Sequence, residues 1–338
     1  MAGAFTDERI DMKRENIVGR ANVADTPELE AYYRELEKRE LGALWNVANE
    51  IEPWFPQPKS VPTIWKWRDV EPLVLQAPKL VSADKAARRV VMLVNPGRKE
   101  WSAAVGLLYS GIQIMDPGES TSAHRHQASA LRFVMEGRGA YTVVDGERMT
   151  LGARDFVLTP NGTWHDHGVE ADGTQCVWQD GLDIPLMSSL DANFYEVHPK
   201  IVQKPGKPKS RKGWQKPYSP LFLYKWDACL AELRKKKSFE YRNPVTGGPV
   251  MPTMGARLER IKGSTRPIRH TGSAIYQVAS GRGWSEIGEE RFEWEEKDVF
   301  VVPAWTRYRH GASSEAVLFS FNDFPAMRAL SLYREARE

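Results

Sequence analysis

The chain has 338 residues, of which 27% are charged, and its formal net charge is only +3 at pH 7. This length exceeds that of a usual single domain and predicts two domains or a duplicated fold. The near balance of charge excludes the strongly basic field of a typical nucleic-acid-binding protein. Cys176 and Cys229 are too few for a disulfide framework, and we expect both to be buried packing residues.

The apolar stretches of the chain have the length of strands, and none approaches the length needed to cross a bilayer. Its first residues, MAGAFTDERIDMKREN, mix both charge signs and contain no apolar segment followed by a cleavage site. These features predict a cytoplasmic protein with no export signal, no membrane span and no nucleic-acid partner.

Helical periodicity marks the N-terminal part of the chain. Over residues 26–51 apolar side chains recur at steps of three and four, which predicts an amphipathic helix or a helix pair that begins at Asp25, Thr26 and Pro27. From about Trp54 onward, prolines punctuate short apolar runs, a pattern typical of an arm that packs along another part of a protein. We therefore predict an N-terminal helical and extended arm over residues 1–95.

Short strands follow. Between residues 107 and 158, apolar runs are separated by turn sequences such as Asp116-Pro117-Gly118 and Asp145-Gly146. Several strands in a row without intervening helices predict an antiparallel barrel or jelly roll, which we place at residues 96–185.

The strand pattern occurs twice. Residues 254–321 can be laid over the first stretch with the two Gly-Arg-Gly turns, Asp155 and Asp298, and Pro160 and Pro303 in register. This duplication predicts a second barrel at residues 251–338, ending in a short helix, and a linker at residues 186–250 whose Pro- and Lys-rich part is a solvated loop. The predicted fold class has an all-β core of two double-stranded β-helix (jelly-roll) barrels with an N-terminal helical arm.

Four of the seven histidines fall into two pairs, His124 with His126 and His165 with His167. In a strand, a spacing of one residue sends both imidazoles to the same face. Two such pairs in one barrel favour a metal site over isolated structural histidines. Three protein ligands suffice for an open, reactive metal, and we expect His124, His126 and His165 to be the ligands, with His167 either supporting them from behind or facing the substrate.

Residues 118–126 and 160–165 resemble the two motifs of the cupin superfamily. The chain departs from the common pattern at Ala130 and Leu131, where most cupins carry a glutamate ligand, and at Val169, where an asparagine is common. A site of three neutral histidines leaves a higher net positive charge at the metal, which favours an anionic chelating substrate.

The segments HRHQASALRFVMEGRGAYTVVDGE, TPNGTWHDHG, NPGRKEW and NPVTGGPVM are similar to those of the gentisate 1,2-dioxygenase family. The resemblance runs from about residue 28 to the C-terminus. It implies a bicupin that binds one Fe(II) per subunit, assembles as a homotetramer and uses O2 to open the ring of a hydroxylated aromatic carboxylic acid. The substrate it favours is gentisate, which would give maleylpyruvate.

Other activities remain open at this stage. The same chemistry on salicylate, a 5-substituted salicylate such as the nitro compound, or 1-hydroxy-2-naphthoate uses the same metal motif. A zinc or manganese cupin isomerase and a non-catalytic bicupin binding protein are further alternatives. Gly162 stands where many family members have a bulky aromatic residue, and we interpret it as a turn residue.

Arg132 has the same strand parity as His124 and His126, so its guanidinium is expected inside the barrel. A buried, unpaired cation is costly, and an incoming carboxylate would satisfy it.

By the same alternation, Tyr109, Gly111 and Gln113 share a polar face of their strand. The family resemblance implies that Gly111 and Gln113 line the substrate pocket, that Gln113 hydrogen-bonds the substrate and that His167 assists proton movement. It also implies that Arg88 approaches the substrate carboxylate, although the sequence cannot choose between Arg88 and Arg89. The full set of candidates is Arg132, His167 and Gln113 as catalytic residues, and Arg88, Tyr109, Gly111, Gln113, Arg132 and Trp164 as substrate-binding residues.

The second barrel serves as an internal control. Alignment on the turns places Ile268, His270, Tyr308 and His310 at the positions of His124, His126, His165 and His167, respectively. Two imidazoles remain where three ligands are needed, which predicts a role in packing or assembly.

Overall fold

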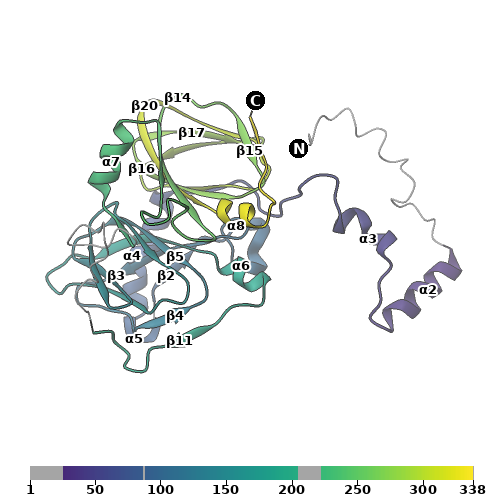
Figure 1. The fold of residues 1–338 in the computed structure, drawn as a ribbon, viewed down its shortest axis with the longest axis horizontal. Helices are drawn as coiled ribbons and strands as arrows, with labels where there is room; N and C mark the ends of the chain where they lie inside the picture. Colours follow the sequence, from purple (N-terminus) through teal and green to yellow (C-terminus); the bar gives the residue numbers. More distant parts are fainter. Residues whose placement is uncertain (1–25, 87, 205–221, 338) are drawn as a thin grey trace. The chain divides into compact units, whose positions relative to one another are not determined.

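The structure of the protein is a computed structural model that describes residues 26–86, 88–204 and 222–337 (Figure 1). It divides into two compact units, residues 1–57 and residues 58–338. The sequence interpretation of residues 1–16 concerns positions outside the described residues. The same is true of the Pro- and Lys-rich loop, except for Lys204. Within the described parts, no helix combines the length and the apolar character needed to cross a membrane.

The first unit contains the predicted helix pair, α2 (Pro27–Glu37) and α3 (Leu44–Ile51). The Thr26 hydroxyl accepts a hydrogen bond from the Leu29 N–H at 3.2 Å, so Thr26 is the expected cap and Pro27 the first helical residue. Tyr33 joins the two helices, because its hydroxyl donates to Asn46 Oδ1 and accepts from Trp45 Nε1, both at 2.9 Å.

The first barrel is a sandwich of two antiparallel sheets with the strand orders β12-β8-β5-β10-β3-β2 and β11-β4-β9-β6-β7. The predicted turns lie between its strands; Asp145 and Gly146, for example, have φ of 49° and 82°, as a two-residue hairpin requires. The strands are β2 (Val90–Met92), β3 (Tyr109–Met115), β4 (His124–His126), β5 (Ala130–Glu136), β6 (Ala140–Val144), β7 (Glu147–Leu151), β8 (Phe156–Thr159), β9 (His165–Val169), β10 (Cys176–Leu182), β11 (Tyr195–Val197) and β12 (Leu223–Tyr224).

The second barrel is formed by a ten-stranded sheet. Ile268 pairs with Tyr308 in it, as His124 pairs with His165 in the first barrel, so the predicted alignment of the two halves is confirmed. The strands are β1 (Thr63–Trp65), β13 (Ser238–Tyr241), β14 (Gly255–Ser264), β15 (Ile268–His270), β16 (Ala274–Ser280), β17 (Arg282–Ile287), β18 (Glu290–Glu295), β19 (Val299–Val302), β20 (Tyr308–Asn322) and β21 (Glu335–Arg337).

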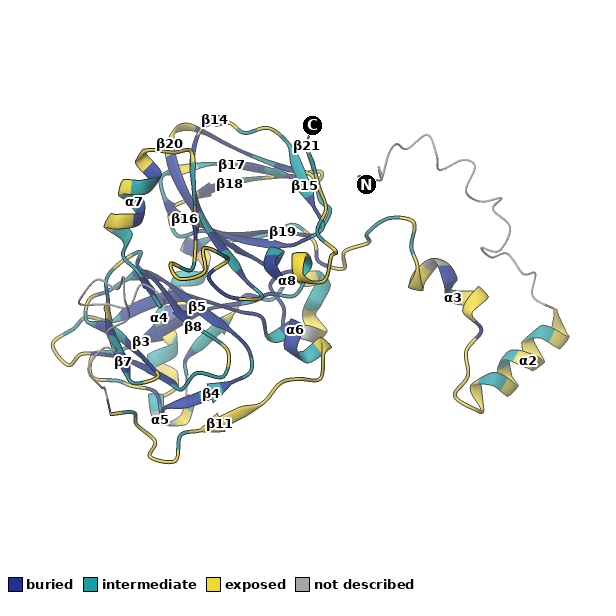
Figure 2. Cartoon of the chain, in the orientation of Figure 1, coloured by how far each residue is buried: buried dark blue, intermediate teal, exposed yellow. Residues whose placement is uncertain are grey.

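The two barrels share an apolar core, visible as the buried strands in Figure 2. Phe133 of the first barrel stacks on Phe319 of the second, with ring centroids 4.1 Å apart. Leu108, Ile112 and Ile114 belong to this core, so they lie on the face of their strand opposite to Tyr109 and Gln113, as alternation predicts. Both cysteines are buried free thiols, which confirms their packing role.

The segments predicted as arm and linker also contribute to the barrels. β1 pairs with β19 and β13 with β14 in the second barrel, whereas β2, β11 and β12 pair with β3, β4 and β8 in the first. The predicted domain boundaries themselves stay a prediction. Short helices occupy the remaining parts: α4 (Trp67–Leu80), α5 (Ala83–Ala86), the 3-10 helix η2 (Pro96–Trp101), α6 (Ile184–Ser189), α7 (Trp226–Arg234) and α8 (Phe324–Ala329).

Two helices differ from the sequence-based expectation. α4 contains Pro72 and Pro78, yet it is a helix because it buries Trp67 and Val74 against the barrel core. The predicted C-terminal helix is present as α8 but ends at Ala329, since the chain then turns into β21 and completes the edge of β15.

The duplication extends to two buried aspartates at the ends of β10 and β20. Asp183 accepts a hydrogen bond from the Ser129 N–H and Asp323 from the Ser273 N–H, both at 2.7 Å. Burial raises the pKa of Asp323 to about 7. The folded chain therefore keeps a proton on Asp323 that the unfolded chain releases near pH 4, so this group loses its stabilising contribution as pH rises from 4 to 7.

We predict that Asp323→Asn removes this pH dependence. Between pH 4 and pH 7, the free energy of unfolding of the wild type should fall by about 4 kcal/mol relative to that of the variant. Urea unfolding at a series of pH values measures the difference, with the exposed Asp172→Asn as control. Parallel curves for Asp323→Asn and the wild type would contradict the prediction.

Candidate metal centre and substrate pocket

Three histidines of the first barrel converge at one place. β4 and β9 are neighbours in their sheet, with His124 opposite His165, and His126 lies on the same face of β4. The ring centroid of His165 lies 4.2 Å from that of His124 and 4.7 Å from that of His126. Their candidate ligand nitrogens all lie within 4.8 Å of one another. The three predicted ligands are therefore brought together.

The hydrogen bonds of these rings indicate which nitrogen is available. Each Nδ1 faces a backbone carbonyl, which can only accept, so the proton is assigned to Nδ1 and the Nε2 lone pair is left free. All three Nε2 atoms are buried and have no hydrogen-bond partner. A divalent cation would satisfy all three, so the residues fit a metal ion. The carbonyls belong to Ser122, Ala128 and Thr163, at 2.7, 2.8 and 3.0 Å from His124, His126 and His165.

The surroundings keep these imidazoles neutral. Burial lowers the pKa of His124 to about 3 and that of His126 to about 4, and it holds the pKa of His165 well below its ordinary value. The positive charge of Arg132 acts in the same direction on all three. Neutral imidazole is the form that binds metals.

A pocket of about 670 Å³ opens beside His126. Its walls are mainly apolar, and its charged groups are two arginines and one aspartate, a combination suited to a small apolar ligand with an anionic group. It is lined by Ala86, Arg88, Val90, Met92, Tyr109, His126, Ala128, Ala130, Arg132, Asp180, Leu182, Ile184, Asn193, Phe194 and Tyr195.

Arg132 is buried, with 2% of its surface exposed, but it is not the unpaired cation that the sequence led us to expect. β10 lies between β3 and β5 and places Asp180 opposite both Arg132 and Gly111. Arg132 Nε lies 3.1 Å from Asp180 Oδ1, and its Nη1 donates to Thr159 Oγ1 at 3.1 Å. Burial raises the pKa of Asp180 to about 6, against the opposing effect of Arg132.

Gln113 and His167 contact each other deep in the barrel, with their Nε2 atoms 2.9 Å apart. The amide nitrogen can only donate, so His167 accepts at Nε2 and its proton is assigned to Nδ1. That Nδ1 is buried without a partner, as is Gln113 Oε1. Complete burial keeps the pKa of His167 well below its ordinary value, which makes the ring a neutral donor.

Comparison with known proteins agrees with this geometry. The Cupin domain family matches residues 111–185. Gentisate 1,2 dioxygenase 1 of Aquipseudomonas alcaligenes is 36% identical over 93% of this chain and 98% of its own. The chain belongs to the gentisate 1,2-dioxygenase family. Accordingly, it is a ring-cleaving dioxygenase with a bicupin fold.

Further relatives of the family broaden the range of substrates. The 5-aminosalicylate 1,2-dioxygenase of a Comamonas species is 34% identical over 91% of this chain and 90% of its own. The crystal structure of a salicylate 1,2-dioxygenase variant from Pseudoaminobacter salicylatoxidans, in complex with gentisate, superposes with a TM-score of 0.87 at 31% identity. That match covers 96% of this chain and 99% of the other.

The structure distinguishes the two adjacent arginines that the family resemblance left open. Arg88 lines the pocket. Arg89 is buried and is not among the pocket-lining residues; its Nη1 donates to Glu119 Oε1 at 2.8 Å, and its Nη2 also pairs with that carboxylate. Of the two arginines, Arg88 is therefore the one that lines the pocket.

Trp164 does not lie among the pocket-lining residues. It precedes His165 and so points to the opposite face of the strand, where its ring contacts His198 at 4.7 Å between centroids and lies under the Arg125 guanidinium. Trp164 is therefore not part of the substrate site that we propose. Gly162 has a φ of 70° with open space around its Cβ position, which supports its interpretation as a turn residue.

Gly111 is not itself among the pocket-lining residues, but it shapes the wall through its neighbours. A Cβ at this position would lie 2.5 Å from Val90 Cγ1 and 2.9 Å from the Tyr109 hydroxyl. The glycine therefore lets the Tyr109 side chain lie across the strand, where it lines the pocket.

The sequence did not indicate one group of pocket-lining residues. Asn193, Phe194 and Tyr195 line the pocket, although they belong to the stretch predicted as a linker. β11 pairs with β4, with Tyr195 opposite His126, and the Tyr195 ring stacks on His124 at 5.3 Å. Nothing local in the sequence of this exposed three-residue strand signals its partner.

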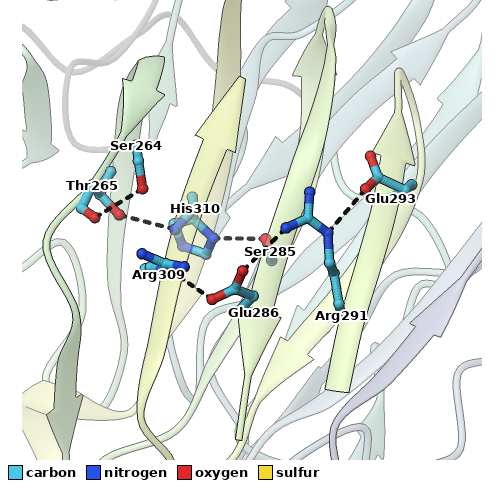
Figure 3. A network of polar contacts seen from close by, with 8 residues as sticks. All are labelled: Ser264, Thr265, Ser285, Glu286, Arg291, Glu293, Arg309 and His310. Atoms are coloured by element: carbon cyan, nitrogen blue, oxygen red, sulfur yellow. Dashed lines mark hydrogen bonds and ion pairs between the residues drawn. The ribbon is translucent and has the colours of Figure 1, made fainter. Parts of the chain in front are cut away.

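The second barrel carries different chemistry at the corresponding place. His270 bonds the Gly272 carbonyl at 2.8 Å, as His126 bonds that of Ala128, but its Nε2 contacts the Tyr308 hydroxyl at 3.1 Å. His310 Nδ1 contacts Ser285 Oγ at 2.7 Å, within the network shown in Figure 3. Over the described parts of the chain, the three histidines of the first barrel are the one group of three that fits a metal ion.

Proposed function

We propose that this protein is an Fe(II)-dependent gentisate 1,2-dioxygenase that converts gentisate and O2 into maleylpyruvate in aromatic catabolism. The observation that carries the proposal is the set of three buried, unpartnered Nε2 atoms beside a pocket that contains Arg88 and Arg132. The name of the 36% identical relative and the gentisate bound to a structural neighbour support the substrate.

One Fe(II) per chain, held by His124, His126 and His165, would supply adjacent coordination positions for the substrate oxygens and O2 and a route for electrons between them. The two arginines would fix the carboxylate of the substrate, since guanidinium groups bind carboxylates in a defined orientation. This positioning removes much of the entropic barrier of a reaction between two bound molecules.

The contact between Gln113 and His167 leaves one hydrogen-bond donor and one acceptor unused. His167 Nδ1 and Gln113 Oε1 are buried without partners. We assign Gln113 to a hydrogen bond with the substrate and His167 to donation toward oxygen, both in a site from which water is excluded. Cleavage between the carbon that bears the carboxylate and the neighbouring carbon that bears the hydroxyl leaves both oxygen atoms of O2 in the product.

A salicylate without the second hydroxyl is the second candidate substrate. The apolar lining residues Ala86, Val90, Ala130, Leu182 and Ile184 offer no side-chain hydrogen-bond partner to a second ring hydroxyl. An unsatisfied polar group in such surroundings costs binding free energy.

Oxygen uptake tests the proposal. The protein is loaded with Fe(II), and uptake and ring-opened product are followed with gentisate, salicylate, 5-aminosalicylate, 5-nitrosalicylate and 1-hydroxy-2-naphthoate in parallel, next to zinc- and manganese-loaded protein. Fastest uptake with gentisate on iron is the expected result. Fastest uptake with another acid would identify that acid as the substrate. No uptake by iron-containing protein would overturn the proposed reaction.

We also propose a cytoplasmic homotetramer. The helix pair α2 and α3 supports the assembly, because the side chains of Tyr32, Leu41, Leu44, Trp45 and Ile51 are each more than 40% exposed and suit a subunit contact. The two free thiols support the reducing compartment. Light scattering should give four subunits per particle for the full chain and fewer once residues 1–57 are removed; a truncated protein that stays tetrameric would contradict the role of the arm.

A further inference from the structure

The second barrel has kept a cavity at the place where the first barrel has its pocket. The cavity measures about 640 Å³ and is lined by His270, which corresponds to His126. Strand pairing confirms the correspondence: Glu335 lies opposite His270 as Tyr195 lies opposite His126. The second barrel therefore has a ligand-sized space but only one of the three metal-ligand histidines, because Ile268 and Tyr308 stand at the positions of His124 and His165.

The position that corresponds to Gly111 is occupied by Arg257. Glu240 lies opposite Arg257 as Met92 lies opposite Gly111, so the two sites are equivalent across their sheets. A residue that leaves space in the first barrel is thus replaced by a guanidinium in the second. Arg257 lines the cavity, and its Nε is buried without a hydrogen-bond partner.

The cavity is rich in positive charge. Two of its four arginines are neutralised within the lining, since Arg242 pairs with Glu240 at 2.6 Å and Arg337 with Glu335 at 2.7 Å. The adjacent cavity shares Arg257 and Arg337 and is lined by six basic and two acidic side chains. Together the two cavities present eight basic and four acidic side chains, which favours an anionic ligand.

Arg257 and Arg328 have no carboxylate partner among the residues that line this cavity. Arg257 has Glu259, on the side of the adjacent cavity, as its carboxylate neighbour at 3.3 Å. Arg328 lies over the Tyr333 ring at 4.2 Å and makes no ion pair with a carboxylate of the described chain. Phe324 and Tyr333 provide aromatic surface beside both.

We propose that the second barrel is a non-catalytic binding site for a small dicarboxylate, with Arg257 and Arg328 holding its carboxylates and Phe324 and Tyr333 flanking its carbon chain. Two cationic groups match a dianion better than a monoanion. Opening the ring next to its carboxylate turns the hydroxyl-bearing carbon into a second carboxylate, so the ring-opened product is itself such a dianion. That last step rests on the proposed function, whereas the binding site does not.

Calorimetric titration of the iron-loaded full chain with maleate tests the site, with crotonate as the monoanion of the same length. We expect maleate to bind and crotonate to bind at least 10-fold more weakly. Arg257→Gln and Arg328→Gln should each weaken maleate binding about 10-fold or more and leave the rate of ring cleavage unchanged. Arg282→Gln, an exposed arginine of the same barrel, should change neither.

The position of the bound maleate is tested with Arg132→Ala. Unchanged maleate affinity in this variant, with loss in the Arg328→Gln variant, supports the second barrel. Loss in Arg132→Ala alone would place maleate in the first barrel and overturn the proposal, as would equal affinities of all variants or no binding at all. Because Arg328 is exposed, its replacement tests the site even where Arg257→Gln does not fold. Oxygen uptake is read separately, so failure of the proposed reaction is distinguished from failure of this site.

Discussion

Replacement of His165 by alanine is expected to remove the bound metal and the ring-cleaving activity together. The His165 ring is central to the group of three, with its centroid within 5 Å of both other rings, so its loss leaves two ligands on one strand. Two imidazoles do not make a catalytic site of the three-ligand type. Since a bound metal supplies several kcal/mol of catalysis, oxygen uptake should fall about 1,000-fold, with metal per chain near zero by elemental analysis.

Two variants make this result specific. His198→Ala, at the partly exposed histidine that contacts Trp164, should keep both metal and activity. His167→Ala should keep the metal, because His167 lies outside the group of three, and lose activity. Full metal content in His165→Ala, with an unchanged circular dichroism spectrum, would show that the three histidines do not form the metal site.

The centre of the site was predictable because it depends on local rules. Alternation along one strand decides that His124 and His126 share a face. Arg132 is buried in the barrel as expected, but it lies on β5 of the other sheet and not on a continuous strand with His126. The duplicated turns then determine which residues of the second barrel correspond to those of the first, as the pairing of Ile268 with Tyr308 shows. The shared face of the two histidines and the alignment of the two repeats need only the spacing of residues within one strand or one repeat.

The parts that the sequence did not indicate depend on contacts between distant segments. Asp180 becomes the partner of Arg132 only because β10 lies between β3 and β5 in one register. Tyr195 reaches His124 because β11 adds to the edge of β4. The choice between Arg88 and its neighbour depends on Glu119, thirty residues away in the chain. Strand order and register are tertiary properties, and spacing within a segment carries no information on them.

The two barrels share residues that hold the fold together but differ in the residues that bind ligands. Both barrels keep the buried aspartate that bonds the backbone of the facing strand, at Asp183 and Asp323, and both keep a cavity of similar volume. Only one keeps three histidines with free Nε2 atoms. The groups that hold the barrel together therefore differ from the groups that determine what it binds, and the latter changed without loss of the former.

Arg132→Ala is expected to keep the metal but to raise the KM for the aromatic acid by about 10- to 100-fold, because a charge-assisted hydrogen bond to a carboxylate contributes about 1.5–3 kcal/mol. The same change leaves Asp180 buried beside an empty space, which should lower the free energy of unfolding by about 3 kcal/mol. Elemental analysis, steady-state kinetics and urea unfolding measure the three quantities, with the partly exposed Arg125→Ala as the matched control.

The pH dependence and a double variant separate binding from stability. Arg132 lowers the pKa of Asp180, so without it Asp180 holds its proton to a pH above 6, and the loss of stability should be smaller at pH 5 than at pH 8. Adding Asp180→Asn should recover stability at pH 8, because a neutral amide is less costly to bury than a carboxylate, yet leave KM high. Recovery of KM by Asp180→Asn would mean that Arg132 acts through Asp180 rather than on the substrate, and an Arg132→Ala protein without metal would assign the arginine to the metal site itself.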